Sequence, residues 1–138
     1  MKPFGRVFAK RRLTRLNGKP PVVVEIGTPR QRRTGEWECP YRIRGLKPKA
    51  GTLRRALGED GVQALELVLQ AIRLELEQHG EKLTWTGEPG EVGFPQFYPD
   101  IFGPVVRRRV IRMINAELAR EGRRLKRRAI RLGVEPKD

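Results

Sequence analysis

The stretch from Gly61 to His79 constrains the fold more than any other part of the sequence. Its apolar residues recur at alternating intervals of three and four, a spacing that places them on one face of an α-helix. This stripe consists of Val62, Leu65, Leu69, Ile72 and Leu76. A second apolar set widens it: Ala64, Leu67, Val68, Ala71 and Leu74. We therefore expect a largely buried helix, roughly 28 Å long at 1.5 Å per residue, across one face of a small sheet.

Both ends of this helix have residues that start and stop helices. Asp60 precedes the first helical residue, and a carboxylate there accepts hydrogen bonds from the free N–H groups of the first turn. Gly80 follows the last periodic residue, where glycine is a common stop signal.

Two strands joined by a tight turn are predicted before the helix. Residues 4–16 alternate in polarity, with Val7, Ala9 and Leu13 on one face. A β-branched run covers residues 22–26, and an Asn-Gly pair between the two segments is a turn signal. The two segments therefore predict a β-hairpin.

A third strand is predicted over residues 36–45, after a polar, solvent-exposed loop at residues 27–35. One face of this strand is apolar and is expected to point inward: Trp37, Cys39, Tyr41 and Ile43. Pro40 lies on the other face and has no N–H to donate to a strand ladder, so we expect the strand to bend there.

The fold class follows from the order of these elements. Residues 46–59 are expected to form a connection with a short helical turn near residues 53–57. Residues 82–86 predict a short strand whose Leu83 and Trp85 face inward. The chain therefore predicts an α+β fold: a four-stranded, mostly antiparallel sheet in the order β-β-β-α-β, packed on the central helix.

Composition changes after this strand. Residues 87–103 contain four glycines and three prolines and break both periodicities. Their aromatic residues are expected to anchor the segment on the domain, with recognition of a ligand or base as the alternative: Phe94, Phe97, Tyr98 and Phe102. We divide the chain into a core domain at residues 1–95, a linker at 96–103, and a basic helix and tail at 104–138.

The C-terminal segment predicts a second, amphipathic helix. Pro104 suits its first turn and Gly133 its end, while Gly122 could permit a close crossing or a kink. Its apolar stripe, a candidate contact surface for a partner, is Val106, Val110, Ile114, Leu118, Leu125, Ala129 and Leu132.

The other faces of this second helix are strongly basic. Residues 104–133 hold ten arginines and one lysine against Glu117 and Glu121, a net charge of +9 within a chain of net charge +14. The candidate polyanion-binding residues are Arg107, Arg108, Arg109, Arg112, Arg120, Arg123, Arg124, Arg127, Arg128 and Arg131. Such a patch attracts nucleic acid, anionic lipid or an acidic protein. A GC-rich genome, indicated by 22 arginines to 8 lysines and no serine, is the alternative explanation.

Several kinds of catalytic and metal chemistry are disfavoured. The chain has no serine nucleophile, and its single cysteine and single histidine, Cys39 and His79, are expected to be a buried hydrophobe and a helix-terminal residue. Glu88 and Glu91 could bind a hard cation but are expected to be solvated. Phosphate-binding glycine motifs are absent from the sequence. We expect no enzyme activity, no cofactor and no metal.

Two further glutamates have a structural explanation. Glu36 and Glu38 flank Trp37 on the outward face of the third strand. We expect them to pair with Arg42 or Arg44 rather than to act as an acid and a base.

Four short stretches together resemble one protein family. They are Trp37 to Ile43 (WECPYRI), the start of the central helix from Gly61 to Gln70, Leu83-Thr84-Trp85, and Gly93-Phe94-Pro95. In this order they are similar to a family of small bacterial domains of unknown function, over roughly residues 4–95. The resemblance implies a bacterial setting and brings no reaction, cofactor or catalytic residue, and the basic C-terminal helix looks like an extension of the family domain.

We therefore expect a cytoplasmic, non-enzymatic binding module. The leading hypothesis is that the apolar stripe of the second helix contacts a protein partner or a second copy. The alternative is a nucleic-acid-binding accessory protein that uses the arginines of that helix. A membrane partner is disfavoured, because residues 104–133 contain no bulky aromatic residue for the apolar face.

Overall fold

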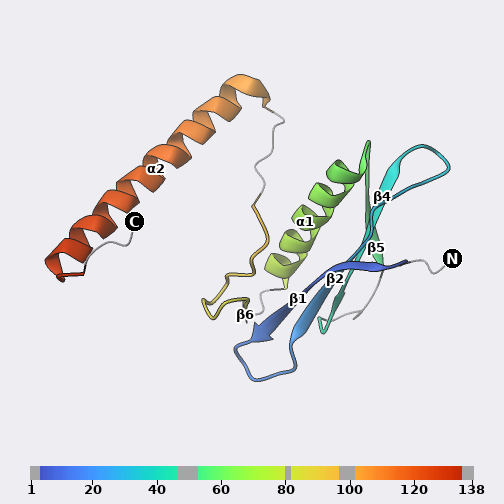
Figure 1. Ribbon diagram of the computed structural model, residues 1–138, viewed down its shortest axis with the longest axis horizontal. Helices are drawn as coiled ribbons and strands as arrows, with labels where there is room; N and C mark the ends of the chain where they lie inside the picture. Colours follow the sequence, from blue (N-terminus) through green and yellow to red (C-terminus); the bar gives the residue numbers. More distant parts are fainter. Residues whose placement is uncertain (1–3, 47–52, 80–81, 97–101, 135–138) are drawn as a thin grey trace. The chain divides into compact units, whose positions relative to one another are not determined.

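The computed structural model describes residues 4–46, 53–79, 82–96 and 102–134. The chain forms two compact units, residues 1–97 and 98–138 (Figure 1). Among the described residues, the first unit contains six strands and one helix, and the second a single helix. In chain order the elements are β1 Val7–Arg15, β2 Val22–Gly27, β3 Arg30–Gln31, β4 Trp37–Arg44, β5 Arg54–Gly58, α1 Gly61–Gln78, β6 Leu83–Thr84 and α2 Gly103–Arg131.

All strand pairs of the sheet are antiparallel, which confirms the predicted fold class. The strands follow the order β3-β4-β2-β1-β6, and β5 pairs with β4 outside this path. The β1–β2 hairpin turns where it was predicted. Gly18 adopts a φ of 76°, and the Asn17 side chain accepts a hydrogen bond from the Lys19 N–H at 3.1 Å.

The strand count is higher than predicted, because two segments pair with β4. The expected solvent loop at residues 27–35 contains β3, and the expected helical turn near residues 53–57 is β5. Both segments are too short and too rich in arginine to show an alternation of their own. The long β4 serves as their template, pairing with β3 at residues 37–38 and with β5 at residues 37–41.

Helix α1 is half exposed rather than largely buried. Its buried residues are spaced four apart: Ala64, Val68, Ile72 and Leu76. Val62, expected on the buried face, is 67% exposed, and Leu74 is 51% exposed. The buried stripe therefore combines Ala64 and Val68 of the widening set with Ile72 and Leu76 of the main stripe, because a single sheet face covers only one sector of a helix.

The inward face of the sheet follows the strand alternation. Leu13 lies opposite Val22 and Val24 opposite Ile43, and these cross-strand pairs form the core with α1. The predicted inward set of β4 is confirmed, since Cys39, Tyr41 and Ile43 are buried and Trp37 is half-buried against the core.

The predicted inward face of β1 is wrong over its first half. The register shifts between Val7 and Ala9, and both residues are exposed. A bulge of this kind interrupts the alternation that the sequence pattern assumes.

The predicted start of α1 is confirmed at atomic detail. Asp60 accepts a hydrogen bond from the Gln63 N–H at 2.8 Å, and Gln63 accepts one from the Glu59 N–H at 2.7 Å. These two bonds tie down both sides of the first turn. The predicted stop at Gly80 lies outside the described residues.

The segment after α1 closes the other edge of the sheet. Leu83 is buried as predicted, whereas Trp85 is 49% exposed. Trp85 instead stacks with Arg11, whose guanidinium lies 4.1 Å from the Trp85 ring centroid and 4.6 Å from that of Phe94. Phe94 anchors the segment as expected, but Phe102 is 68% exposed. Phe97 and Tyr98 lie outside the described residues.

Helix α2 ends in a glycine cap, as predicted. Gly133 adopts a φ of 68° and donates to the carbonyl of Ile130 at 3.1 Å, while Val134 donates to that of Ala129 at 3.0 Å. These two bonds satisfy carbonyls that the helix itself leaves free. At 29 residues the helix is roughly 43 Å long.

Candidate functional site

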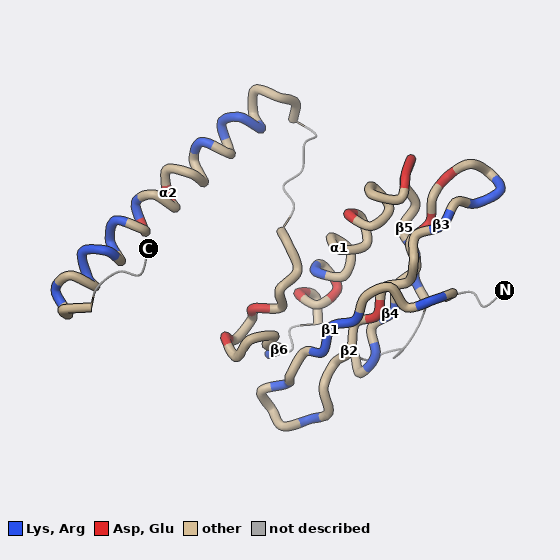
Figure 2. Tube along the Cα trace, viewed as in Figure 1, with Lys and Arg blue, Asp and Glu red and all other residues tan. Residues whose placement is uncertain are grey.

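Lysine and arginine recur along the whole of α2 (Figure 2). At about 100° per residue, six of them fall within a sector of roughly 100° around the helix axis. We call this set the basic face of α2: Arg109, Arg112, Arg120, Arg123, Arg127 and Arg131. None of the residues of α2 is buried, so the whole row is accessible within its own unit.

Little of the positive charge on α2 is neutralised by the helix itself. Arg120 contacts Glu117 at 2.6 Å, and Arg124 donates from Nε to Glu121 at 2.9 Å. The hydrogen bond from Arg124 lowers the pKa of Glu121, so this carboxylate stays charged. These are the only two acids within α2, against eleven basic residues.

The last two turns of α2 gather four arginines around one hollow. The hollow has a volume of about 470 Å³. It is lined by Arg124, Arg127, Arg128 and Arg131. Side chains three and four residues apart lie beside one another on a helix, which brings these guanidinium groups together. The arrangement suits an anion with several oxygen acceptors.

The apolar stripe of α2 is exposed along its length. Leu118 is 65% exposed, Leu125 52% and Leu132 68%, while Val106 and Val110 are partly shielded. Ile114 and Ala129 are partly shielded as well. Ile111, on the flank of the stripe and 45% exposed, was missed in the sequence because the 3-4 spacing passed over it.

The sheet has a second basic surface on the face that points away from α1, which we call the open face. Its first group, the Glu25 cluster, consists of Glu25, Lys10, Arg42 and Arg44. The carboxylate pairs with Arg42, with Arg44 at 3.3 Å and with Lys10 at 3.9 Å. Arg42 also stacks over Phe4, at 4.3 Å from the ring centroid.

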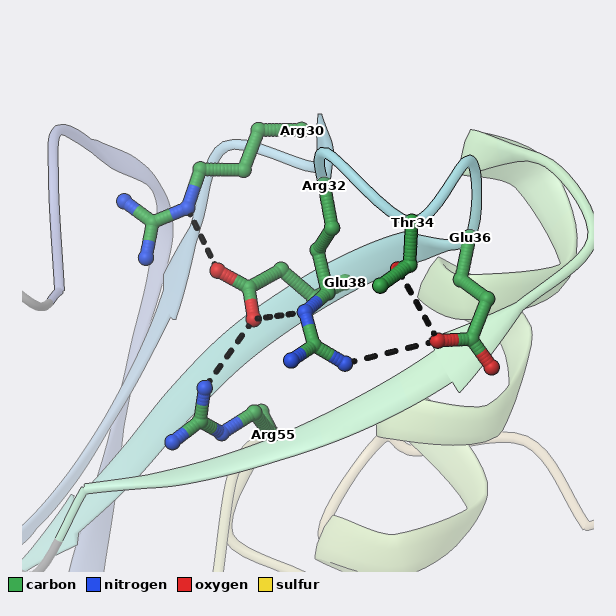
Figure 3. Close-up of polar contacts among 6 residues, drawn as sticks. All are labelled: Arg30, Arg32, Thr34, Glu36, Glu38 and Arg55. Atoms are coloured by element: carbon green, nitrogen blue, oxygen red, sulfur yellow. Dashed lines mark hydrogen bonds and ion pairs between the residues drawn. The ribbon is translucent and has the colours of Figure 1, made fainter.

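The second group, the Glu38 cluster, consists of Glu38, Arg30, Arg32 and Arg55 (Figure 3). Arg30 donates from Nε to Glu38 at 2.7 Å, and Arg55 from Nη1 at 3.1 Å. The Nε of Arg32 lies 3.8 Å from the same carboxylate, and its Nη1 contacts Glu36 at 3.4 Å. β3 and β5 place Arg30 and Arg55, so the two strands that the sequence pattern missed build this cluster.

The prediction that Glu36 and Glu38 pair with Arg42 or Arg44 is therefore wrong. Glu38 pairs with Arg30, Arg32 and Arg55, and Arg42 and Arg44 pair instead with Glu25. The reason is register, because β2 places Glu25 directly opposite Arg42.

Both central carboxylates remain ionised although they are buried. Burial is the largest single influence and raises the pKa of Glu38, but the hydrogen bonds and charges of Arg30 and Arg55 outweigh it and lower the pKa below its ordinary value of 4.5. The same balance, with Arg42 as the main partner, lowers the pKa of Glu25.

The cysteine is placed for packing. Cys39 is fully buried and donates from Sγ to the carbonyl of Gly27 at 3.5 Å. Burial raises the pKa of its thiol to about 11, so it is not a thiolate nucleophile at neutral pH. His79 lies at the C-cap of α1.

Among the described residues, no group of three or more His, Cys, Asp or Glu side chains is arranged to hold a metal ion. No helix among them is long and apolar enough to cross a membrane.

The fold and these surfaces define a class: an α+β domain with an antiparallel sheet, one packed helix and a basic open face, followed by a separate basic helix. A family model described as "Domain of unknown function (DUF6968)" matches residues 9–96, more than half of the chain. The chain belongs to this family, which confirms the resemblance to a domain family of unknown function. No curated protein and no solved structure matches the chain. The helix α2 lies outside the matched residues.

Proposed function

We propose that this protein is a non-enzymatic accessory protein that binds nucleic acid, with the basic face of α2 lying against the phosphate backbone. The observation that supports this most strongly is the basic face itself, because six arginines share one sector of a helix that has no buried residue. The helix has a net charge of +9, which a partner with many negative charges would neutralise.

Nucleic acid fits this requirement for two physical reasons. Arginine has a planar fork of N–H donors that matches phosphate oxygens. Each neutralised phosphate also releases condensed counterions, so a row of arginines gains affinity without reading any base sequence. We therefore expect sequence-tolerant, salt-dependent binding.

An exposed stripe on the same helix favours a second candidate function, a protein contact. Leu118, Leu125 and Leu132 would be covered if α2 paired with an amphipathic helix. The stripe is bordered by arginines, so an acidic partner fits it better than a second copy, which would place +9 against +9. The mass of the protein in solution, with Leu118→Gln/Leu125→Gln as the comparison, tests self-association. A monomer for both proteins would leave only the acidic partner for this candidate.

The nucleic-acid proposal is tested by two charge-matched double variants. Arg123→Gln/Arg127→Gln removes two charges from the basic face, and Arg108→Gln/Lys126→Gln removes two charges outside that sector. Binding to a fluorescent 20-base-pair duplex is measured by anisotropy over a salt series. The first variant should lower the slope of log affinity against log salt by about 1.8, at roughly 0.9 per lost phosphate contact, and the second should change it much less. Equal changes for both would mean that net charge alone, and not the basic face, determines binding.

A further inference from the structure

The open face of the sheet contains more positive charge than its carboxylates require. Glu25 and Glu38 are each contacted by three basic side chains, six in total. Arg32 also contacts Glu36. One cation is enough to neutralise a carboxylate, so three of the six charges are in excess of these three carboxylates. Arg12 adds another, because it lies opposite Val23 in a row that continues to Arg44.

The buried carboxylates hold these cations in place while leaving them accessible. The side chains of Glu25 and Glu38 are only 9% and 7% exposed, whereas those of Arg44 and Arg55 are 53% and 57% exposed. Each guanidinium has five N–H donors, and the contact with the carboxylate uses only part of them. Arg44 and Arg55 are more than half exposed while a buried carboxylate holds each of them, which lowers the entropic cost of binding an anion.

The spacing of the two clusters favours a polymer over a small anion. Glu38 and Arg42 lie four residues apart along β4, which corresponds to about 13 Å at 3.3 Å per residue. A single phosphate can reach only one cluster, whereas a chain of phosphates can contact both. Arg12, Arg42 and Arg44 extend the same surface across β1, β2 and β4.

We propose that the open face of the sheet is a second phosphate-binding surface, on which the Glu25 and Glu38 clusters hold arginines ready to contact the backbone of a nucleic acid. This inference rests on the proposed function for the identity of the polymer, but it places part of the binding in the family domain and not in α2. Residues of the matched region, 9–96, provide all seven of these basic side chains.

The test compares variants of the full chain that differ only in the position of the lost charge. Arg44→Gln/Arg55→Gln removes one exposed cation from each cluster and leaves each glutamate two partners. Lys19→Gln/Lys82→Gln removes two charges from exposed positions outside the open face. On the same duplex and salt series, the first should lower the log–log slope by about 1.8 and the second should leave it near wild type.

A single substitution keeps the test decisive even if a double variant does not fold. Arg12→Gln should lower the slope by about 0.9 without removing a partner of either glutamate. Circular dichroism and thermal melting identify any variant that does not fold, and Arg12→Gln then decides the question.

The outcomes separate this inference from the proposed function. If the sheet variants behave like their lysine control while Arg123→Gln/Arg127→Gln lowers the slope, the open face is not a binding surface and the proposed function stands. If only the sheet variants lower the slope, the open face binds the duplex and the proposed role of α2 is wrong. If the wild-type protein does not bind the duplex, both are overturned.

Discussion

Replacing Glu38 with glutamine should destabilise the fold, because this carboxylate joins β3, β4 and β5. It accepts hydrogen bonds from Arg30 at 2.7 Å and from Arg55 at 3.1 Å. Hydrogen bonds to charged groups contribute about 1.5–3 kcal/mol each when buried. The side chains of Arg30 and Arg55 are 29% and 57% exposed, so solvent screens both, and the lower end of that range applies. We expect Glu38→Gln to lower the free energy of unfolding by about 2–3 kcal/mol at pH 7.

The effect of Glu38→Gln should depend on pH in a defined direction. The pKa of Glu38 is lowered by folding, so the unfolded chain binds the proton more readily. The stabilisation is therefore complete above the ordinary pKa of 4.5 and is lost as the pH falls through the lower folded value. The difference between wild type and variant should be full at pH 7 and should shrink below about pH 4.

A neighbouring glutamate provides the matched control. Glu36 lies two residues away, but its side chain is 54% exposed and its contact with Arg32 is 3.4 Å long. Glu36→Gln should therefore cost less than about 1 kcal/mol. Urea unfolding of the three proteins at pH 7 and pH 3 measures both effects. Equal losses for the two variants, or a Glu38→Gln loss that is unchanged at pH 3, would refute this reasoning.

Three further predictions concern the core. Ile72→Ala should cost about 2–5 kcal/mol in urea unfolding, whereas Leu74→Ala, in the same helix but half exposed, should cost clearly less; similar losses would contradict the observed face of α1. Gly27→Ala should lower the melting temperature, because a Cβ there would lie 2.6 Å from Pro40 Cγ; an unchanged melting temperature would show that the strands can move apart. Cys39 should resist thiol reagents at pH 8 until the protein is unfolded, so rapid labelling of the folded protein would contradict its burial.

Long periodic segments could be predicted from the sequence because their own pattern determines their structure. The helices α1 and α2, the β1–β2 hairpin and the inward face of β4 were all read correctly in this way. The exposure of half of α1 was not predicted. The sequence shows which residues are apolar, but not how wide a surface of the helix the sheet can cover. Val62 and Leu74 are the residues that reveal this difference.

Short segments could not be predicted, because a neighbouring strand decides their conformation. β3 and β5 consist of two and five residues, and their hydrogen bonds come from β4. The two glutamate clusters depend on this pairing and on the register that places Glu25 opposite Arg42. The sequence alone indicated that α2 is basic. Predicting the basic open face would also have required the strand order.

The affinity of the full chain for a generic 20-base-pair duplex, measured by fluorescence anisotropy between 50 and 200 mM salt, tests the central claim most directly. If the six arginines of the basic face of α2 each neutralise one phosphate, they alone should give a log–log slope of about −5 and a loss of affinity of about a thousandfold over this range, and contacts from the open face would make the slope steeper. Absence of binding at 50 mM salt, or binding with a slope near zero, would contradict the account.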